Sequence, residues 1–176
     1  TWASGWKSPI YCDNRKILSY PKTRTYIRDR FVDIIRQKYP ETEVIAGVAT
    51  GAIAIGALVA DVLNLPFIYI RSKPKDHGLE NLIEGDLNPN QKVVVVEDLV
   101  STGISSLNAA EAVNNYGGVV IGMVAIFTYN FKHAIDNFKK ANIELTALSR
   151  YQILIDTAVE IGEITSDQVE TLMKWR

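Results

Sequence analysis

The residues best placed to do chemistry follow the most apolar stretch of the sequence. Four valines at 93–96 are typical of a strand buried on both faces, and Glu97 and Asp98 come directly after them. Two adjacent carboxylates are costly to bury without partners. We therefore expect both to emerge at the edge of a sheet, where hydroxyl groups or a metal ion can meet them.

Small residues and a glycine follow these acids and lead into a helix. Such a run lets the backbone wrap closely around an anion, and the start of a helix offers free N–H groups and a positive dipole end. A phosphate monoester would fit there. The alternative is that Glu97 and Asp98 are solvated and that residues 101–106 only cap a helix. The combination favours a ribose-phosphate site, because the acids can hold sugar hydroxyls while the amides hold a 5-phosphate.

The stretch VVVVEDLVSTGISS resembles the phosphoribosyl-pyrophosphate signature of type I phosphoribosyltransferases. It is neither a Walker A loop, which needs a lysine after the glycine, nor a GxGxxG motif. The resemblance implies that Glu97 and Asp98 hold the ribose hydroxyls, with Asp98 taking part in catalysis. It also implies that Ser101 touches the base and that the phosphoribosyl group is bound by Leu99, Val100, Ser101, Thr102, Gly103, Ile104 and Ser105.

A polar stretch from Arg71 to Asn90 lacks any sustained periodicity, and we expect a long loop there. Loops of this length inside compact domains are often lids or binding segments. The loop begins with four groups that are or can become cationic within seven positions, Arg71, Lys73, Lys75 and His77. They could close over a polyanion, although most such runs are simply solvated.

This stretch resembles the RxKPKxHG catalytic loop of orotate phosphoribosyltransferases. The resemblance implies that all four cationic groups bind phosphoribosyl pyrophosphate and that Arg71, Lys75 and His77 are catalytic. In that family the loop reaches into the site of the neighbouring subunit, which implies a homodimer.

A third segment, Ser4 to Arg15, is similar to the SGxxSPxYxDxR segment of the same family. Orotate is a flat ring with a carboxylate, so its site needs an aromatic face and a cation, for which Tyr11 and Arg15 are candidates. Without the resemblance, a half-buried aromatic and a surface ion pair would be the simpler interpretations. Many family members carry a lysine near Gly51, where this chain has Thr50-Gly51-Ala52.

Hydrophobic periodicity places these segments in an alternating α/β order. We expect helices at 20–39, 51–63, 102–115, 131–140, 151–161 and 167–175, and strands at 44–49, 67–70, 93–96, 119–127 and 143–148. Alternation of this kind predicts a mainly parallel sheet flanked by helices. The resemblance implies that this is the type I phosphoribosyltransferase fold with a small N-terminal hood. We expect His133 to face solvent, and the spacing of Trp2, Trp6 and Trp175 indicates no stacking arrangement.

Length and composition agree with one globular domain over residues 1–176, although the abrupt start at Thr1 is compatible with a trimmed hood. A net charge of -1 with no basic block argues against nucleic acid as a partner, and no apolar run is long enough to predict a membrane span. Cys12, the single cysteine, cannot form an internal disulfide. We therefore expect a cytoplasmic protein.

The resemblance as a whole implies transfer of the 5-phosphoribosyl group from phosphoribosyl pyrophosphate to orotate, in pyrimidine (UMP) synthesis. Orotate and phosphoribosyl pyrophosphate would be the small-molecule partners. Mg²⁺ would be the cofactor, held mainly through the substrate's pyrophosphate and not by a dedicated protein site. Two alternatives stay open: a phosphoribosyltransferase for another base, and a regulator of the same fold that senses phosphoribosyl pyrophosphate without catalysis.

Overall fold

The structure is a computed structural model that describes residues 7–73 and 82–175. These residues form one six-stranded sheet with the order β3-β2-β1-β4-β5-β6. The strands are β1 (Val44–Val48), β2 (Phe67–Ile70), β3 (Ile83–Glu84), β4 (Lys92–Val100), β5 (Val119–Thr128) and β6 (Leu145–Arg150). All neighbouring pairs are parallel except β2 and β3, which confirms the mainly parallel sheet that the sequence predicts.

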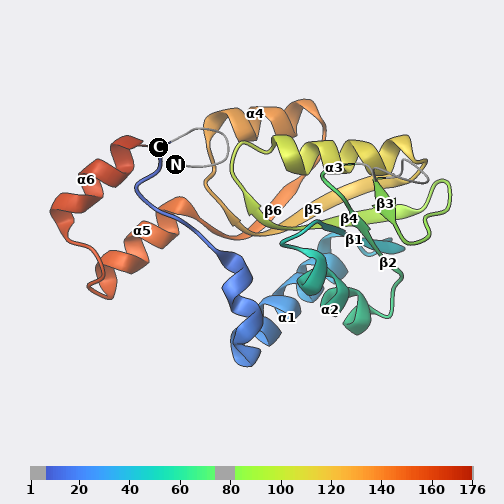
Figure 1. Cartoon of the computed structure of the whole chain (residues 1–176), viewed down its shortest axis with the longest axis horizontal. Coiled ribbons are helices and arrows are strands. Elements are labelled where there is room, and N and C mark those ends of the chain that lie inside the picture. Colours follow the sequence, from blue (N-terminus) through green and yellow to red (C-terminus); the bar gives the residue numbers. More distant parts are fainter. Residues whose placement is uncertain (1–6, 74–81, 176) are drawn as a thin grey trace.

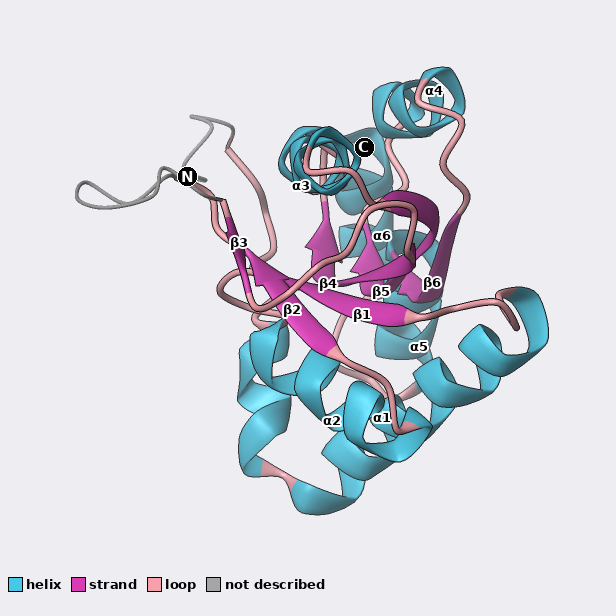
Figure 2. Cartoon of the chain, turned by 90° about the vertical axis from the view of Figure 1, so that its right-hand side faces the viewer, coloured by secondary structure: helices cyan, strands magenta, loops and turns pink. Residues whose placement is uncertain are grey.

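Helices cover both faces of this sheet (Figures 1 and 2). Helices α1 and α2 lie on one face, and α3 and α4 lie on the other. The helices are η1 (Asn14–Ser19, a 3₁₀ helix), α1 (Pro21–Lys38), α2 (Ile53–Leu63), α3 (Ile104–Asn115), α4 (Lys132–Lys140), α5 (Tyr151–Glu160) and α6 (Ser166–Trp175). The first layer buries Phe31 and Ile55, and the second buries Ala110 and Phe138.

Strand β4 lies between β1 and β5, and the side chains of its valines 93–96 are 0% exposed. Because both faces of this strand are covered, every side chain along it must be apolar until the strand nears its end. The strand is longer than the sequence predicts and runs on through Val100. Glu97 and Asp98, which we expected at the very end of this strand, therefore lie inside it.

The predicted loop from Arg71 to Asn90 also contains regular structure. Strand β3 pairs antiparallel with β2, with Tyr69 opposite Glu84 and Ile70 opposite Ile83. The Arg71 Nη1 lies 3.2 Å from a carboxylate oxygen of Glu84 and forms an ion pair with it. The return of the chain onto the sheet edge was not predicted, because a two-residue strand carries no periodicity.

Helices α5 and α6 extend the chain beyond the sheet (Figure 1). They pack through an aromatic cluster in which the Trp175 ring lies 5.9 Å from Tyr129, 5.5 Å from Phe131 and 5.6 Å from Tyr151, between centroids. The sequence did not predict this cluster, in which Trp175 packs edge-on or tilted against each of the three rings. His133 stacks on Phe131 at 5.4 Å and is half-buried, so its predicted solvent-facing position is wrong.

The topology also locates the functional edge of the sheet. From β1 the chain passes through α2 to β2 on one side, and from β4 it passes through α3 to β5 on the other. In sheets of this kind, ligands bind outside the carboxyl ends of the strands where the strand order reverses. That point lies between β1 and β4.

Among the described residues no helix is long and apolar enough to cross a membrane.

Candidate functional site

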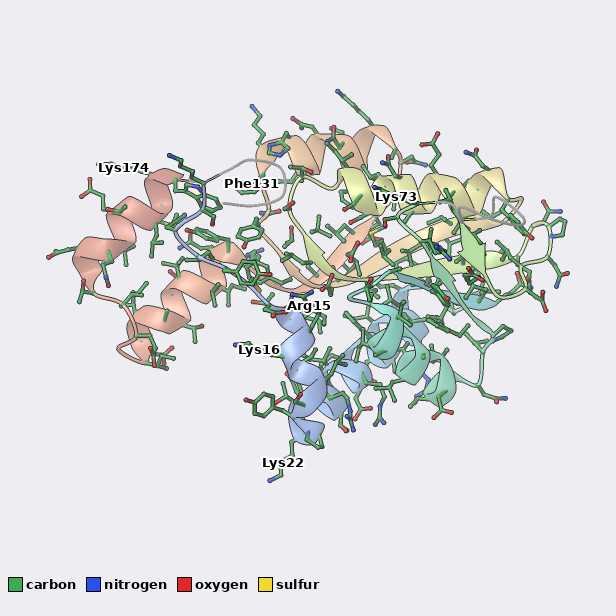
Figure 3. The ribbon with its side chains drawn as sticks, in the orientation of Figure 1. Arg15, Lys16, Lys22, Lys73, Phe131 and Lys174 are labelled. Atoms are coloured by element: carbon green, nitrogen blue, oxygen red, sulfur yellow. The ribbon has the colours of Figure 1, made fainter. Side chains whose placement is uncertain are left out.

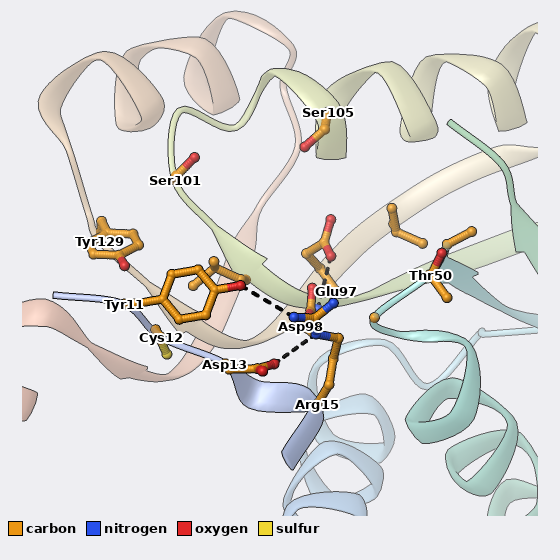
Figure 4. Close-up of a pocket in the computed structure, with 14 residues that line it drawn as sticks. Tyr11, Cys12, Asp13, Arg15, Thr50, Glu97, Asp98, Ser101, Ser105 and Tyr129 are labelled. Carbon is orange, nitrogen blue, oxygen red and sulfur yellow. Dashed lines mark hydrogen bonds and ion pairs between the residues drawn. The ribbon is translucent and has the colours of Figure 1, made fainter. Parts of the chain in front are cut away.

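A cavity of about 690 Å³ opens at this reversal point between β1 and β4 (Figure 4). It is bounded by the N-terminal segment, the turn after β1, the end of β4, the start of α3 and one side chain beyond β5. The lining residues are Tyr11, Cys12, Asp13, Arg15, Val48, Ala49, Thr50, Gly51, Glu97, Asp98, Leu99, Ser101, Ser105 and Tyr129.

The predicted phosphate cradle borders this cavity. The turn 101–103 connects β4 to α3, and Gly103 adopts a left-handed conformation with φ of 80°. Only glycine suits this position, because a Cβ there would also lie 2.8 Å from the Phe138 ring. Ser101 and Ser105 face the cavity, and the first N–H groups of α3 lie beside them. Val100 is fully buried in the sheet, so only its backbone can serve a ligand.

Glu97 is buried, which corrects the expectation that it emerges at the sheet edge. Its side chain is 4% exposed. One carboxylate oxygen accepts a hydrogen bond from the Asp98 N–H at 2.9 Å, and the other accepts one from the Ser106 hydroxyl at 2.8 Å. Burial, and then the neighbouring Asp98, raises the pKa of Glu97 to about 8. The side chain thus ties β4 to α3 as a largely neutral acid near pH 7.

Asp98 has a different environment from its neighbour. It is partly exposed and lines the cavity. Its backbone carbonyl accepts a 2.7 Å hydrogen bond from the Asn14 side chain. Its carboxylate packs against Gly51, where a Cβ would lie 2.1 Å from one carboxylate oxygen. Gly51 therefore leaves the space that the carboxylate occupies.

Two of the three residues predicted to contact the base, Tyr11 and Arg15, lie at the mouth of the same cavity. Tyr11 is 75% exposed, and its hydroxyl oxygen accepts a 3.3 Å hydrogen bond from Arg15. Arg15, at the start of η1 (Figure 3), also donates to Asp13 at 2.7 Å. This hydrogen bond lowers the pKa of Asp13. In Figure 4, Ser101 and Ser105 lie across the cavity from these side chains. The base and phosphate candidates thus face one another.

A second hollow of about 300 Å³ adjoins this site beyond the end of β2. Ala49 and Thr50 line both cavities. The second one also receives Arg71 and Lys73, two of the four predicted pyrophosphate-binding residues. The other two, Lys75 and His77, lie outside the described residues.

Several lining residues were not predicted from the sequence. The turn 48–51 after β1 is the largest omission, although a strand followed by Thr-Gly-Ala at the carboxyl edge of a parallel sheet could have indicated it. Tyr129 could have been found in the same way, because it comes just after the carboxyl end of β5. Cys12 and Asp13 lie inside the recognised N-terminal segment but were given no role.

Comparison with known proteins places these features in a family. The model of the phosphoribosyl transferase domain matches residues 15–144. The match, the fold and the cavity together define a phosphoribosyltransferase.

Curated relatives define the family more narrowly. An orotate phosphoribosyltransferase of Porphyromonas gingivalis is 58% identical over the whole chain and 84% of its own length. One of Cytophaga hutchinsonii is 58% identical over 99% of the chain and 84% of its own length. The chain belongs to the orotate phosphoribosyltransferase family.

Solved structures agree with this assignment. UMP synthase of Leishmania donovani has a TM-score of 0.83 at 27% identity, over 99% of this chain and 38% of that one. Adenine phosphoribosyltransferase from the same organism has a TM-score of 0.65 at 24% identity, over 82% of this chain and 75% of that one. The second likeness shows that the fold alone does not settle which base is used.

The buried acid gives a prediction about stability. Because folding raises the pKa of Glu97 from its ordinary 4.5 to about 8, the folded protein holds this proton more tightly than the unfolded chain does. Stability therefore falls as pH rises from about 4.5 towards 8. Glu97→Gln keeps both hydrogen-bond partners and cannot ionise. The free energy of unfolding of this variant should therefore increase relative to that of the wild type as pH rises across this range. Urea unfolding between about pH 5 and 8 measures the difference. Parallel pH profiles would rule out the buried, neutral acid, and Glu111→Gln on the exposed surface of α3 is the control.

The contact between Gly51 and Asp98 gives a second prediction. Gly51→Ala would displace the Asp98 carboxylate, the group predicted from the sequence to hold ribose hydroxyls. Loss of hydrogen bonds to a charged group costs roughly 1.5 to 3 kcal/mol, so ribose 5-phosphate should bind about tenfold more weakly or worse. Titration calorimetry measures this, with Ala54→Ser on the exposed side of α2 as the control. Unchanged affinity in Gly51→Ala would exclude Asp98 from sugar binding.

Proposed function

We propose that this chain transfers the 5-phosphoribosyl group from phosphoribosyl pyrophosphate to a ring nitrogen of orotate, giving orotidine 5-phosphate and pyrophosphate. The observation that carries the proposal is one cavity with Ser101 and Ser105 on one side and Tyr11 and Arg15 on the other. A sugar phosphate held by the first pair would present its anomeric carbon towards a ring held by the second. The identity of the relatives over the whole chain supports orotate as the base.

In this reaction the ring nitrogen attacks the anomeric carbon as pyrophosphate leaves, and the sugar passes through an oxocarbenium-like state. Catalysis depends on alignment and on stabilising the departing negative charge. The N–H groups and hydroxyls at 101–105 hold the 5-phosphate, and Ser101 also contacts the base. Asp98 accepts hydrogen bonds from the ribose hydroxyls. Because both oxygens of Glu97 are already engaged inside the fold, its contribution to the ribose contact is to fix Asp98 and α3.

Arg71, Lys73, Lys75 and His77 neutralise the leaving pyrophosphate in this proposal. Arg71 and Lys73 line the smaller hollow beside the turn 48–51, at the same edge of the sheet as the main cavity. This position suits that role. Mg²⁺ would supply further positive charge. The described residues contain no group of three or more His, Cys, Asp or Glu side chains that could hold a metal. In this proposal the ion arrives on the oxygens of the pyrophosphate and keeps part of its water.

The direct test mixes the protein with orotate, phosphoribosyl pyrophosphate and Mg²⁺ and follows the loss of orotate absorbance. Adenine and guanine serve as alternative acceptors in parallel. We expect turnover with orotate and none with the purines. Turnover with a purine alone would favour a phosphoribosyltransferase for another base. Binding of phosphoribosyl pyrophosphate without turnover of any base would favour a sensor.

Arg15 provides a prediction about base recognition. Arg15→Ala removes the cation proposed for the orotate carboxylate and should raise the orotate KM roughly tenfold to a hundredfold, with a smaller effect on kcat. Lys16→Ala is a matched control, because Lys16 is the adjacent exposed cation and does not line the cavity. Initial rates at varied orotate measure both. An orotate KM unchanged in Arg15→Ala would remove Arg15 from the base site.

Lys75 provides a prediction about the leaving group. Lys75→Ala should lower kcat about 10²-fold, the scale of a single electrostatic stabiliser, with less effect on either KM. Near-normal turnover would contradict the role.

We also propose a homodimer in which this loop serves the partner's site. Mixing Lys75→Ala with Asp98→Asn should then restore part of the activity, because mixed dimers contain one intact site. Absence of rescue in mixed dimers would contradict the sharing.

A further inference from the structure

The segment that carries the proposed base contacts belongs to neither a helix nor the sheet. Residues 7–13 have no regular hydrogen-bond ladder in the structure. The Ser8 hydroxyl makes only local bonds, to the Ile10 carbonyl at 2.7 Å and from the Ile10 N–H at 3.2 Å. The position of Tyr11 therefore depends on what this extended segment packs against.

The segment packs against the opposite end of the chain. In Figure 1 it runs from beside the end of α6 to η1. The indole N–H of Trp175 donates a 2.7 Å hydrogen bond to the backbone carbonyl of Lys7. Trp175 is itself fixed from three sides by the rings of Tyr129, Phe131 and Tyr151. Tyr151 is fully buried and donates from its hydroxyl to the Leu172 carbonyl at 2.9 Å, which holds α6 in place.

The same packing reaches the cavity. Ile10 and Cys12 pack against the buried cluster that contains Phe131 and Leu172. Cys12 and Tyr129 each belong to this cluster and also line the cavity. A displacement of α6 would therefore move the wall beside the base contacts. The phosphate cradle at 101–105, by contrast, is held by β4 and α3.

We propose that Trp175 is a positioning residue for the base subsite: it anchors residues 7–13 to α6 and thereby sets where Tyr11 and Arg15 meet the base. The inference rests on the proposed function, since it names the part of the substrate whose binding depends on this contact. Trp175 does not line the cavity, so it acts through the segment and not on the substrate.

The test uses Trp175→Phe, which keeps an aromatic ring in the cluster and removes the N–H donor. A net hydrogen bond of about 0.5–1.5 kcal/mol corresponds to about a threefold to tenfold change. We expect the orotate KM to rise by that factor, with kcat and the KM of phosphoribosyl pyrophosphate within about twofold of the wild type. The matched control is Lys174→Ala, because Lys174 has a 74% exposed side chain and pairs with Glu170 on the surface of α6 (Figure 3).

A second measurement reports on the anchor without any turnover. Cys12 is the single cysteine of the chain and lies within the anchored segment, so a thiol reagent labels that segment alone. Its thiol pKa is raised by burial and then by Asp98 and Asp13, so all proteins are labelled at one fixed alkaline pH. Cys12 is partly buried, and release of the segment should expose it further. We therefore expect labelling to be about threefold to tenfold faster in Trp175→Phe and unchanged in Lys174→Ala.

The outcomes separate the possibilities. Unchanged labelling would overturn the anchor, and faster labelling with an unchanged orotate KM would overturn its role in base positioning. A similar rise in the KM of both substrates together with a lower Tm would mean that Trp175 contributes only to general stability. That result would overturn the proposal. If the wild type does not use orotate at all, the proposed function fails together with base positioning, while the labelling rates still decide whether Trp175 holds the segment.

Discussion

The site depends on the burial of β4 on both faces. A strand enclosed between β1 and β5, and between two layers of helices, can carry polar groups only near its end. The reversal of strand order places the end of β1 next to that point. The turn 48–51, the acids of β4 and the start of α3 must therefore meet at one edge. Physical constraints on the sheet thus bring together the half of the cavity that contains Glu97, Asp98 and residues 101–105.

The two acids of β4 illustrate how one residue of sequence changes the chemistry of a carboxyl group. Successive side chains of a strand point to opposite faces, so Glu97 and Asp98 cannot share an environment. Glu97 turns towards the Ser106 hydroxyl and is enclosed, which raises its pKa. Asp98 turns towards Gly51 and the cavity. A neutral neighbour also spares Asp98 the repulsion of a second full charge, so the carboxylate that faces the cavity carries its charge alone.

The sequence was sufficient for the sheet and for placing the turn 101–105 beside a cavity, because both follow from local patterns. Four consecutive valines predict a doubly buried strand, and Ser101 to Ser105 predict an anion-binding turn. Local patterns were insufficient where burial or distant packing decides. Glu97 was expected at the edge, since its enclosure depends on Ser106 in the next helix. Trp175 gave no signal, because its aromatic partners lie 24 to 46 positions earlier in the sequence. The strand β3 was missed because its two residues are too few to show a repeating pattern of apolar and polar side chains.

The difference between local patterns and packing between distant residues also distinguishes the two halves of the cavity. The phosphoribosyl half is built by neighbouring strands and falls within residues 15–144, the range of the family match. Tyr11, and the Trp175 contact that holds its segment, fall outside that range. In the proposed function, the sheet therefore holds the sugar and phosphate, while residues 7–13 and Arg15 position the base. If Trp175 positions the segment that carries Tyr11, base recognition depends on α6, although Trp175 does not line the cavity.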